Sequence, residues 1–198
     1  ARSSRMQVVL PGIETPERPS QTISTSAVMV GRLHPVKDHA TALRAWAQVG
    51  SSSTRPTLTL VGDGPERGRL QALASELGIA DVVDFVGETD PRPYLYGASM
   101  FVSTSVAEGF SRSLLEALLA GVPSVATAVG GVLDLPAGTV RIVPAGDPGA
   151  IAAVLLDVLA DPDASKRAAE TARAVATNFS LSACHRSYRR LYAQMGAI

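Results

Sequence analysis

Several features that would assign the chain to a specialised class are scarce in its sequence. The single cysteine, Cys184, excludes an internal disulfide and is typical of a protein from a reducing compartment. No apolar run approaches the roughly 20 residues that span a bilayer, and no secretory signal opens the sequence. Eighteen basic residues balance eighteen acidic ones, so no net field attracts the whole molecule to nucleic acid or to an anionic membrane. We therefore expect a cytoplasmic protein that recognises its partner at a local site, without a membrane span or a nucleic-acid partner.

Two common catalytic arrangements are also missing. The three histidines, His34, His39 and His185, are scattered, whereas a metal site needs a cluster of ligands. The Asp-Pro-Asp stretch at 161–163 is better explained as a helix start than as a metal-binding Asp-x-Asp. No G-x-S-x-G elbow occurs, which disfavours serine hydrolysis. We expect a site without a metal ion.

What the sequence does contain is a regular alternation of two kinds of segment. Short, fully apolar runs alternate with longer amphipathic ones, which is typical of a parallel sheet covered by helices. Strands are expected at 27–30, 58–61, 82–86, 100–104, 123–127 and 140–143. Helices are expected near 38–49, 65–77, 92–97, 112–120 and 148–160, and they fill the region from 163 to about 195. The predicted fold class is α/β, a Rossmann-like parallel sheet with helices on both faces.

The first residues differ in character from the rest. The stretch LPGIETPERPSQT is rich in proline and reads as a linker. Before it, MQVVL (6–10) looks like one more buried strand, which suggests that it belongs to a different domain of a longer chain. A disordered or edge-strand N-terminus explains the same pattern, so both interpretations stay open.

In an open parallel sheet, ligands bind beyond the carboxyl ends of the strands. The stretch GRLHPVKDH follows the first strand there. Gly31 permits a tight turn, while Arg32 and Lys37 put two cations on one loop before a helix, which suits a diphosphate. A solvated basic loop in which Asp38 starts the helix has the same pattern.

The second strand is followed by GDGPERG, which resembles the start of a dinucleotide fingerprint. Gly62 and Gly64 fit G-x-G-x-x-G, but the next glycine, Gly68, comes one position too late. Asp84 lies about where a ribose-binding acid would fall. An NAD-binding domain of an oxidoreductase is therefore an alternative, disfavoured because the fingerprint should follow the first strand.

The fourth strand is followed by a loop that enters a helix. Glu108 lies in this loop and Glu116 lies inside the helix, whose free N–H groups favour an anion. Gly109 lets a ligand approach the backbone, and each carboxylate can accept hydrogen bonds from neighbouring hydroxyls. Taken singly, Glu108 also fits a helix-dipole charge and Glu116 a surface position on an amphipathic helix.

Taken together, these segments resemble a known family in order and spacing. The sequence is similar to the retaining glycosyltransferases of the GT-B superfamily, of the group 1 type, and to their C-terminal, nucleotide-sugar-binding domain. The resemblance is carried by VVLPGIE, VGRLHPVKD, LVGDGPER, VVDFVGE, EGFSRSLLEALLAGVPSVAT, VGG and FSLSACHRSYRRLY. Its most specific element is the pair Glu108 and Glu116, with seven residues between them and with the surrounding glycines. Two positions depart from the family pattern: Pro11 replaces an Asn, and Asp134 stands where Glu is usual.

The resemblance implies a role for each candidate residue. The predicted catalytic residues are Arg32, Lys37 and Glu108, of which the two cations would hold the donor's diphosphate. Glu108 and the backbone at 109–111 would meet the transferred sugar, and Glu116 would bind the ribose hydroxyls. The segment 85–88 would contact the nucleobase, largely through backbone groups. The predicted donor-binding residues are thus Gly31, Gly62, Phe85, Gly87, Gly109, Phe110, Ser111 and Glu116.

The resemblance also implies an activity and a division into domains. The reaction would move a hexose-type sugar from a nucleoside diphosphate sugar, with UDP or GDP as the leaving group, and with neither metal nor cofactor. Residues 1–24 would end an N-terminal domain and form the linker, 25–180 would form the donor domain, and 181–198 a helix packing toward the domain interface. The acceptor, and any peripheral membrane contact, would belong to the missing domain, so this chain alone should bind nucleotide without turnover. A non-catalytic nucleotide-sugar-binding module is a further alternative.

Overall fold

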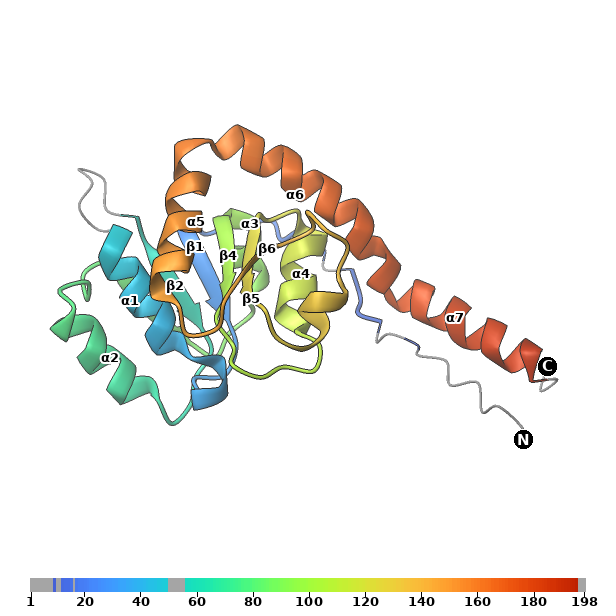
Figure 1. Ribbon diagram of the computed structural model, residues 1–198, viewed down its shortest axis with the longest axis horizontal. Coiled ribbons are helices and arrows are strands. Elements are labelled where there is room, and N and C mark those ends of the chain that lie inside the picture. The colour runs from blue at the N-terminus through green and yellow to red at the C-terminus, as the bar shows by residue number, and fades with distance from the viewer. Residues whose placement is uncertain (1–8, 10–11, 16, 50–55, 196–198) are drawn as a thin grey trace.

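A parallel β-sheet forms the centre of the molecule. The computed structural model describes residues 9, 12–15, 17–49 and 56–195, and Figure 1 shows how their elements are arranged. The strands are β1 Thr25–Val30, β2 Leu58–Val61, β3 Val83–Gly87, β4 Ala98–Ser103, β5 Ser124–Thr127 and β6 Arg141–Val143. Their order is β3-β2-β1-β4-β5-β6, and neighbouring strands are parallel. The predicted α/β, Rossmann-like class is confirmed.

The strand order creates a switch point between β1 and β4. From β1 the chain adds β2 and β3 on one side, and it then returns to add β4, β5 and β6 on the other. Ala27 of β1 pairs with Leu58 of β2 and with Met100 of β4, which fixes the register on both sides. The loops that leave the carboxyl ends of β1 and β4 run to opposite faces of the sheet, and ligands bind in the crevice between such loops.

Helices cover both faces of the sheet. One face carries α1 His39–Val49, α2 Arg67–Glu76 and α5 Pro148–Ala160, and the other carries α3 Arg92–Gly97, α4 Arg112–Ala120 and α6 Pro162–Ala176. Ala27 and Met29 of β1 enter the first core, whereas Val28 between them enters the second. Both cores take alternate side chains from one strand, because successive side chains point to opposite faces. The continuous apolar sequence of β1 predicts this double burial.

Local sequence signals set several helix ends. The hydroxyl of Ser111 accepts a hydrogen bond of 3.4 Å from the backbone N–H of Leu114 and starts α4. Gly121 ends α4 in the left-handed conformation, with φ 76°. Asp161 accepts a hydrogen bond of 2.9 Å from the N–H of Ala164 and caps α6. The Asp-Pro-Asp stretch is therefore a helix start, as predicted.

The region from 163 to about 195 forms two helices separated by a break. After α6, a short 3-10 turn covers Thr177–Phe179, and α7 spans Leu181–Gln194. Ser180 is extended, and its hydroxyl accepts a hydrogen bond of 3.3 Å from the N–H of Ala183. Phe179 is buried in the second core. The N-cap serine and the buried ring together interrupt the helix.

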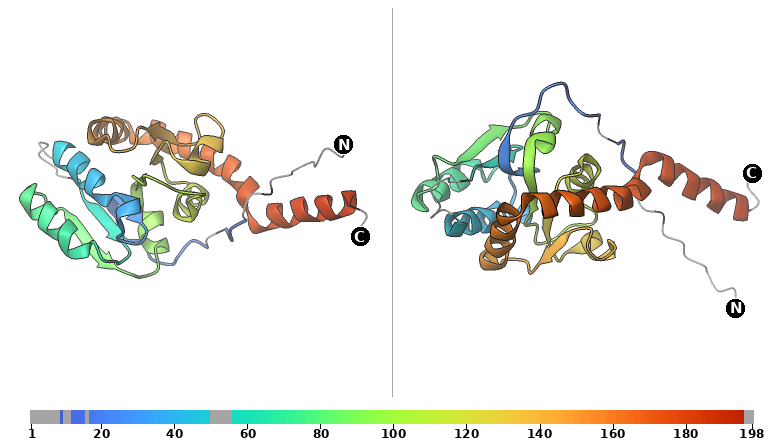
Figure 2. Two further views of the ribbon diagram at one scale, coloured as in Figure 1. Left: turned by 60° about the horizontal axis from the view of Figure 1, so that its bottom comes forward. Right: turned by 90° about the horizontal axis from the view of Figure 1, so that it is seen from above.

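The second of these helices projects from the body of the molecule (Figure 2). Its base is tied to the segment that precedes the sheet: Ile13 donates to the carbonyl of Phe179 at 2.9 Å and accepts from the N–H of Leu181 at 2.8 Å. None of the residues of α7 is buried. Within the described ranges, no helix is long and apolar enough to cross a membrane. The strand predicted over residues 6–10 lies, apart from Val9, outside the described residues.

Candidate functional site

The loops after β1 and β4 meet through an ion pair at the switch point. The ammonium of Lys37 donates to both carboxylate oxygens of Glu108, at 2.8 and 2.9 Å. The two residues are 71 positions apart in the sequence, and both side chains are largely buried. The structure therefore brings together two of the three predicted catalytic residues.

The backbone that carries Lys37 makes a tight turn. Pro35–Lys37 form one 3-10 turn, which His34 caps by accepting from the N–H of Val36 at 3.3 Å. Asp38 follows in the left-handed region, with φ 46° and ψ 48°. Its carboxylate accepts from the hydroxyl of Thr41 at 2.6 Å and so joins the turn to α1. The predicted role of Asp38 as a helix start is confirmed.

Two residues of the β4 loop hold this turn from the other side. The hydroxyl of Thr104 lies 2.8 Å from the carbonyl of Lys37 and 2.8 Å from that of Asp38. The N–H of Val106 donates to the carbonyl of Val36 at 2.9 Å. The two loops are thus joined by backbone contacts as well as by the ion pair.

The backbone of the Glu108 loop packs closely against two glycines, Gly130 and Gly131. The N–H of Gly131 donates to the carbonyl of Gly109 at 2.7 Å. A side chain at Gly130 would clash with the carbonyl of Glu108, and one at Gly131 would clash with the ring of Phe110. Gly130 also has a φ of 50°, which favours glycine. Gly130 and Gly131 therefore lie directly against the backbone of the Glu108 loop.

Three neighbours of Glu108 differ in their exposure. Nothing lies within 4 Å of a Cβ built on Gly109, so the backbone there is open to a ligand. Ser111 is buried, and its hydroxyl caps α4; the first N–H groups of a helix have no acceptor within the helix itself. Phe110 does not face the ion pair: its ring packs on that of Phe179, with centroids 5.3 Å apart.

Arg32, Gly31 and Gly62 line a separate hollow of about 460 Å³ on the β2 side of the crevice. Gly62 must be a glycine, since a side chain there would clash with the carbonyl of Gly31. Arg32 is exposed. The structure does not bring its guanidinium into hydrogen-bonding contact with the Lys37–Glu108 pair. Arg32 and Lys37 were predicted to hold the diphosphate together. In the structure they lie in different parts of one loop: Arg32 lines this hollow, and Lys37 pairs with Glu108.

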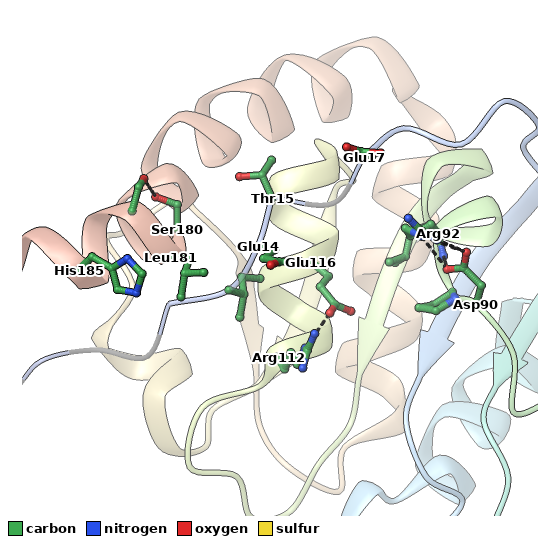
Figure 3. Close-up of a pocket in the computed structure, with 14 residues that line it drawn as sticks. Glu14, Thr15, Glu17, Asp90, Arg92, Arg112, Glu116, Ser180, Leu181 and His185 are labelled. Atoms are coloured by element: carbon green, nitrogen blue, oxygen red, sulfur yellow. Dashed lines mark hydrogen bonds and ion pairs between the residues drawn. The ribbon is translucent and has the colours of Figure 1, made fainter.

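Glu116 lines a larger cavity, of about 970 Å³, on the other side (Figure 3). Its carboxylate accepts from Nε of Arg112, one helical turn earlier on α4, at 2.9 Å. The remaining lining comes from three segments: residues 13–15 and 17, residues 90–92 with Leu95, and residues 180–182 with His185. Glu116 is thus neither a plain surface residue nor a partner of Lys37.

The segment 85–88 has much of its backbone already engaged. The carbonyl of Phe85 accepts from Nη2 of Arg67 at 2.9 Å, and its ring packs against the first core. The carbonyl of Gly87 accepts from the N–H of Gly62 at 2.8 Å. Glu88, which follows, lines the hollow of Arg32. The C-terminal end of this segment therefore lies at the crevice, whereas Phe85 does not.

Sequence reasoning missed one buried histidine. His39, the first residue of α1, is 3% exposed, and its Nδ1 has no hydrogen-bond partner. Burial, with a smaller contribution from Lys37, lowers the pKa of His39 to about 4. The signal was present, because His39 shares one helical face with Leu43 and Trp46, four and seven positions later. His39 is therefore a neutral, buried residue that follows the Lys37 turn in the chain.

Within the described residues, no three side chains of His, Cys, Asp or Glu are grouped so that they could hold a metal ion. What the crevice does offer is the ammonium of Lys37, the guanidinium of Arg32 in the hollow on the β2 side, and the N-terminus of α4. These groups suit a phosphorylated ligand. The carboxylates of Glu108 and Glu116, on either side of that N-terminus, suit hydroxyl groups.

A Rossmann-like fold whose switch point carries groups suited to phosphate and hydroxyl ligands defines the class of the chain, and comparison with known proteins specifies it. The family Glycosyl transferases group 1 matches residues 24–161. The chain belongs to this family. The NAD-binding alternative is not supported by this assignment.

Two curated relatives illustrate the similarity. The chain is 36% identical over 166 residues to the D-inositol 3-phosphate glycosyltransferase of Streptomyces coelicolor, covering 77% of this chain and 36% of that protein. It is 35% identical over 108 residues to the 2-deoxystreptamine glucosyltransferase of Streptomyces kanamyceticus, covering 53% and 28%. The chain thus spans about a third of the length of the curated relatives it matches.

Solved structures with the same fold are GT-B glycosyltransferases. HepE of Anabaena, solved in complex with UDP, superimposes with a TM-score of 0.79 at 25% identity, over 86% of this chain and 49% of that one. Sucrose-phosphate synthase of Thermosynechococcus elongatus gives a TM-score of 0.83 at 27% identity, over 96% and 53%. The fold and family expected from the sequence are confirmed.

Proposed function

We propose that this chain is the C-terminal, donor-binding domain of a retaining GT-B glycosyltransferase that transfers a hexose from a nucleoside diphosphate sugar. The observation that carries the proposal is the Lys37–Glu108 pair at the switch point of a sheet from this family. UDP is the nucleotide we propose, because HepE, at 25% identity, was solved with UDP and with UDP-glucose.

Breaking the bond between the anomeric carbon and the diphosphate leaves negative charge on the leaving group. Lys37, Arg32 and the N-terminus of α4 supply positive charge and N–H donors for that charge. Groups that are fixed before the reaction stabilise such a transition state without reorganisation. These groups suffice without a divalent metal or a bound cofactor, so we propose a metal-free site.

Glu108 has two partners in succession in this scheme. In the free chain it neutralises Lys37 at 2.8 Å. When the donor binds, Lys37 turns to the phosphate, and Glu108 accepts hydrogen bonds from hydroxyls of the transferred sugar. The open backbone at Gly109 gives the sugar room beside it.

The nucleoside lies on the side of Glu116. The carboxylate of Glu116 accepts hydrogen bonds from the ribose hydroxyls, while Arg112 holds it from the preceding turn at 2.9 Å. The base lies near 86–88, at the carboxyl end of β3. A donor in this position runs along the N-terminus of α4, from Glu116 to the Lys37–Glu108 pair.

The acceptor binds to a second domain outside this sequence. We propose separately that the enzyme is cytoplasmic. Residues 1–24 lead from that domain, 25–180 form the donor domain, and 181–198 return toward the interface. The contact of Ile13 with Phe179 and Leu181 supports this division, because it joins the incoming segment to the base of α7. A hexose cannot be transferred efficiently by one half of such a cleft, since the acceptor is neither held nor shielded from water.

A thermal-shift panel tests the proposal. UDP, GDP, ADP and NADH are added at equal concentrations, with and without chelator, because a ligand that binds the folded state raises Tm. We expect the largest shift with UDP, none with NADH and no effect of chelator. No shift with any nucleotide, or a shift abolished by chelator, would refute the metal-free nucleotide site. A UDP-release assay with UDP-glucose and candidate acceptors should show no acceptor-dependent turnover, and turnover would refute the missing-domain argument.

A further inference from the structure

Thr104 connects the two sides of the switch point through a single hydroxyl. It follows the end of β4 and is fully buried, with 0% exposure. Its Oγ1 lies 2.8 Å from the carbonyl oxygens of both Lys37 and Asp38, which are 67 and 66 positions away in the sequence. The hydroxyl has one hydrogen, so the two carbonyls share one donor.

The turn that Thr104 contacts needs support. Among the described residues, Asp38 alone has a positive φ without being a glycine, and such a conformation persists only where the surroundings hold it. The side chain of Asp38 contributes through Thr41, whose N–H also donates to the carbonyl of Asp38 at 3.1 Å. Thr104 holds the same turn from the β4 side.

The position of this turn determines where the ammonium of Lys37 lies. Thr104 fixes the carbonyl of Lys37 itself, and Lys37 reaches Glu108 at 2.8 Å from that anchored backbone. Val106 donates to Val36 on the same turn, but through its backbone N–H, which no substitution except proline removes. Thr104 is therefore the side chain through which the anchoring can be changed.

We propose that Thr104 is a positioning residue that holds the ammonium of Lys37 at the sugar-proximal phosphate of the donor. This inference rests on the proposed function. The sugar-proximal phosphate follows from the ion pair, because Glu108 meets the sugar and Lys37 lies next to Glu108. In UDP this phosphate is the terminal one, and UMP lacks it. The effect of Thr104 should therefore be confined to diphosphate binding.

Thr104→Val tests the role of the hydroxyl. Valine keeps the shape of threonine and removes the donor, and no water can replace it at a fully buried position. Calorimetric titration should show the Kd for UDP raised roughly tenfold and the Kd for UMP raised less than about twofold. Thr104→Ser keeps the hydroxyl and should restore UDP binding to within about twofold of the wild type.

Thr59→Val is the matched control, because Thr59 is a buried threonine of β2 whose hydroxyl donates to that of Thr25 at 3.0 Å. It should lower Tm without changing the ratio of the UDP and UMP dissociation constants. If Thr104→Val does not fold, Thr104→Cys replaces it, since a thiol is a weak donor of similar size. The same selective loss is expected of Thr104→Cys.

Equal weakening of UDP and UMP by Thr104→Val or Thr104→Cys would overturn the inference, because a merely structural role predicts that result. Unchanged UDP binding would overturn it as well. A wild-type chain that does not bind UDP would instead refute the proposed function. The two failures are therefore distinguishable.

Discussion

The crevice between β1 and β4 and the projecting helix α7 are opposites in how they are held. In the crevice, Thr104, Val106 and Glu108 contact residues about 70 positions earlier, and Thr104 is completely buried. On α7, the rings of Tyr188 and Tyr192 contact each other, with centroids 6.2 Å apart, and neither is buried. In the crevice, contacts between two distant loops hold the turn that carries Lys37, whereas α7 has an apolar face without a described partner.

Because the crevice and α7 differ in their contacts, substitutions in the two regions should have different effects. Substitutions in the crevice should change ligand binding or the pH dependence of folding. Substitutions on the part of α7 beyond His185 should change neither, because that part does not line the cavity of Glu116 and few native contacts are lost there.

The largest effect should be the pH dependence of stability that the buried His39 causes. The pKa of His39 is about 4 in the folded chain and about 6.5 in the unfolded one, so the unfolded state binds more protons between these values. This stabilisation is complete above pH 6.5 and is lost as the pH falls toward 4, by about 2 kcal/mol between pH 7 and pH 5. Asp38 and Glu66 oppose the effect of Lys37 on this group.

Urea unfolding at pH 7 and pH 5 measures this loss directly. His39→Met should be less sensitive to pH than the wild type by that amount. His185→Gln, which changes an exposed histidine on α7, should leave the pH dependence as it is. Parallel pH profiles for the wild type and His39→Met would show that His39 is not the group responsible.

The next effect concerns the ribose. Glu116→Ala should weaken UDP binding roughly tenfold, because hydrogen bonds to a charged acceptor are among the stronger ones. A 2′-deoxy or 3′-deoxy UDP should lose a similar amount with the wild type and little more with Glu116→Ala. Additive losses in this calorimetric cycle would place Glu116 away from the ribose. Glu116→Gln shows separately what the charge contributes, since the amide keeps one acceptor.

A smaller effect, of opposite sign, is expected at the ion pair. Glu108→Gln removes a carboxylate that competes with phosphate for Lys37, so UDP should bind roughly threefold more tightly. UDP-glucose should gain less, because the variant also loses charge-assisted hydrogen bonds to the sugar. Glu170→Gln on α6, an exposed carboxylate, is the control. Weaker UDP binding by Glu108→Gln would mean that Glu108 is needed to hold Lys37 in place.

The smallest effect is expected on α7. Tyr192→Ala should change the free energy of unfolding by less than about 0.5 kcal/mol, as is usual for exposed positions. Urea unfolding of the wild type and the variant measures this change. A decrease of more than about 1 kcal/mol in the free energy of unfolding would show that α7 packs against other groups in solution. The crevice and α7 would then not differ as described.

Much of the fold could be predicted from the sequence, because strands buried on both faces have continuous apolar sequences. The strand of Ala27 to Val30 is an example, although it begins two residues earlier, at Thr25. The break at Ser180 was harder to find, since helix-forming residues continue on both sides. Its signal was an N-cap serine after a buried phenylalanine.

The candidate site was predictable only in part. Glycines and charges after strands indicated which loops matter, because such loops gather at one edge of a parallel sheet. The pairing of Lys37 with Glu108, and the hydroxyl of Thr104 beneath it, depend on contacts about 70 residues apart that no local pattern contains. The placement of Phe110 against Phe179 is likewise a matter of tertiary packing.

The most direct test of the central claim is calorimetric titration of UDP into the wild type, Lys37→Ala and Arg186→Ala. Both variants lose one positive charge, but Arg186 lies on the exposed helix α7. We predict that Lys37→Ala raises the Kd for UDP at least tenfold, since it removes a charge-assisted contact to phosphate. Arg186→Ala should stay within about twofold of the wild type. Equal affinities of the wild type and Lys37→Ala would contradict the assignment of the crevice as the diphosphate site.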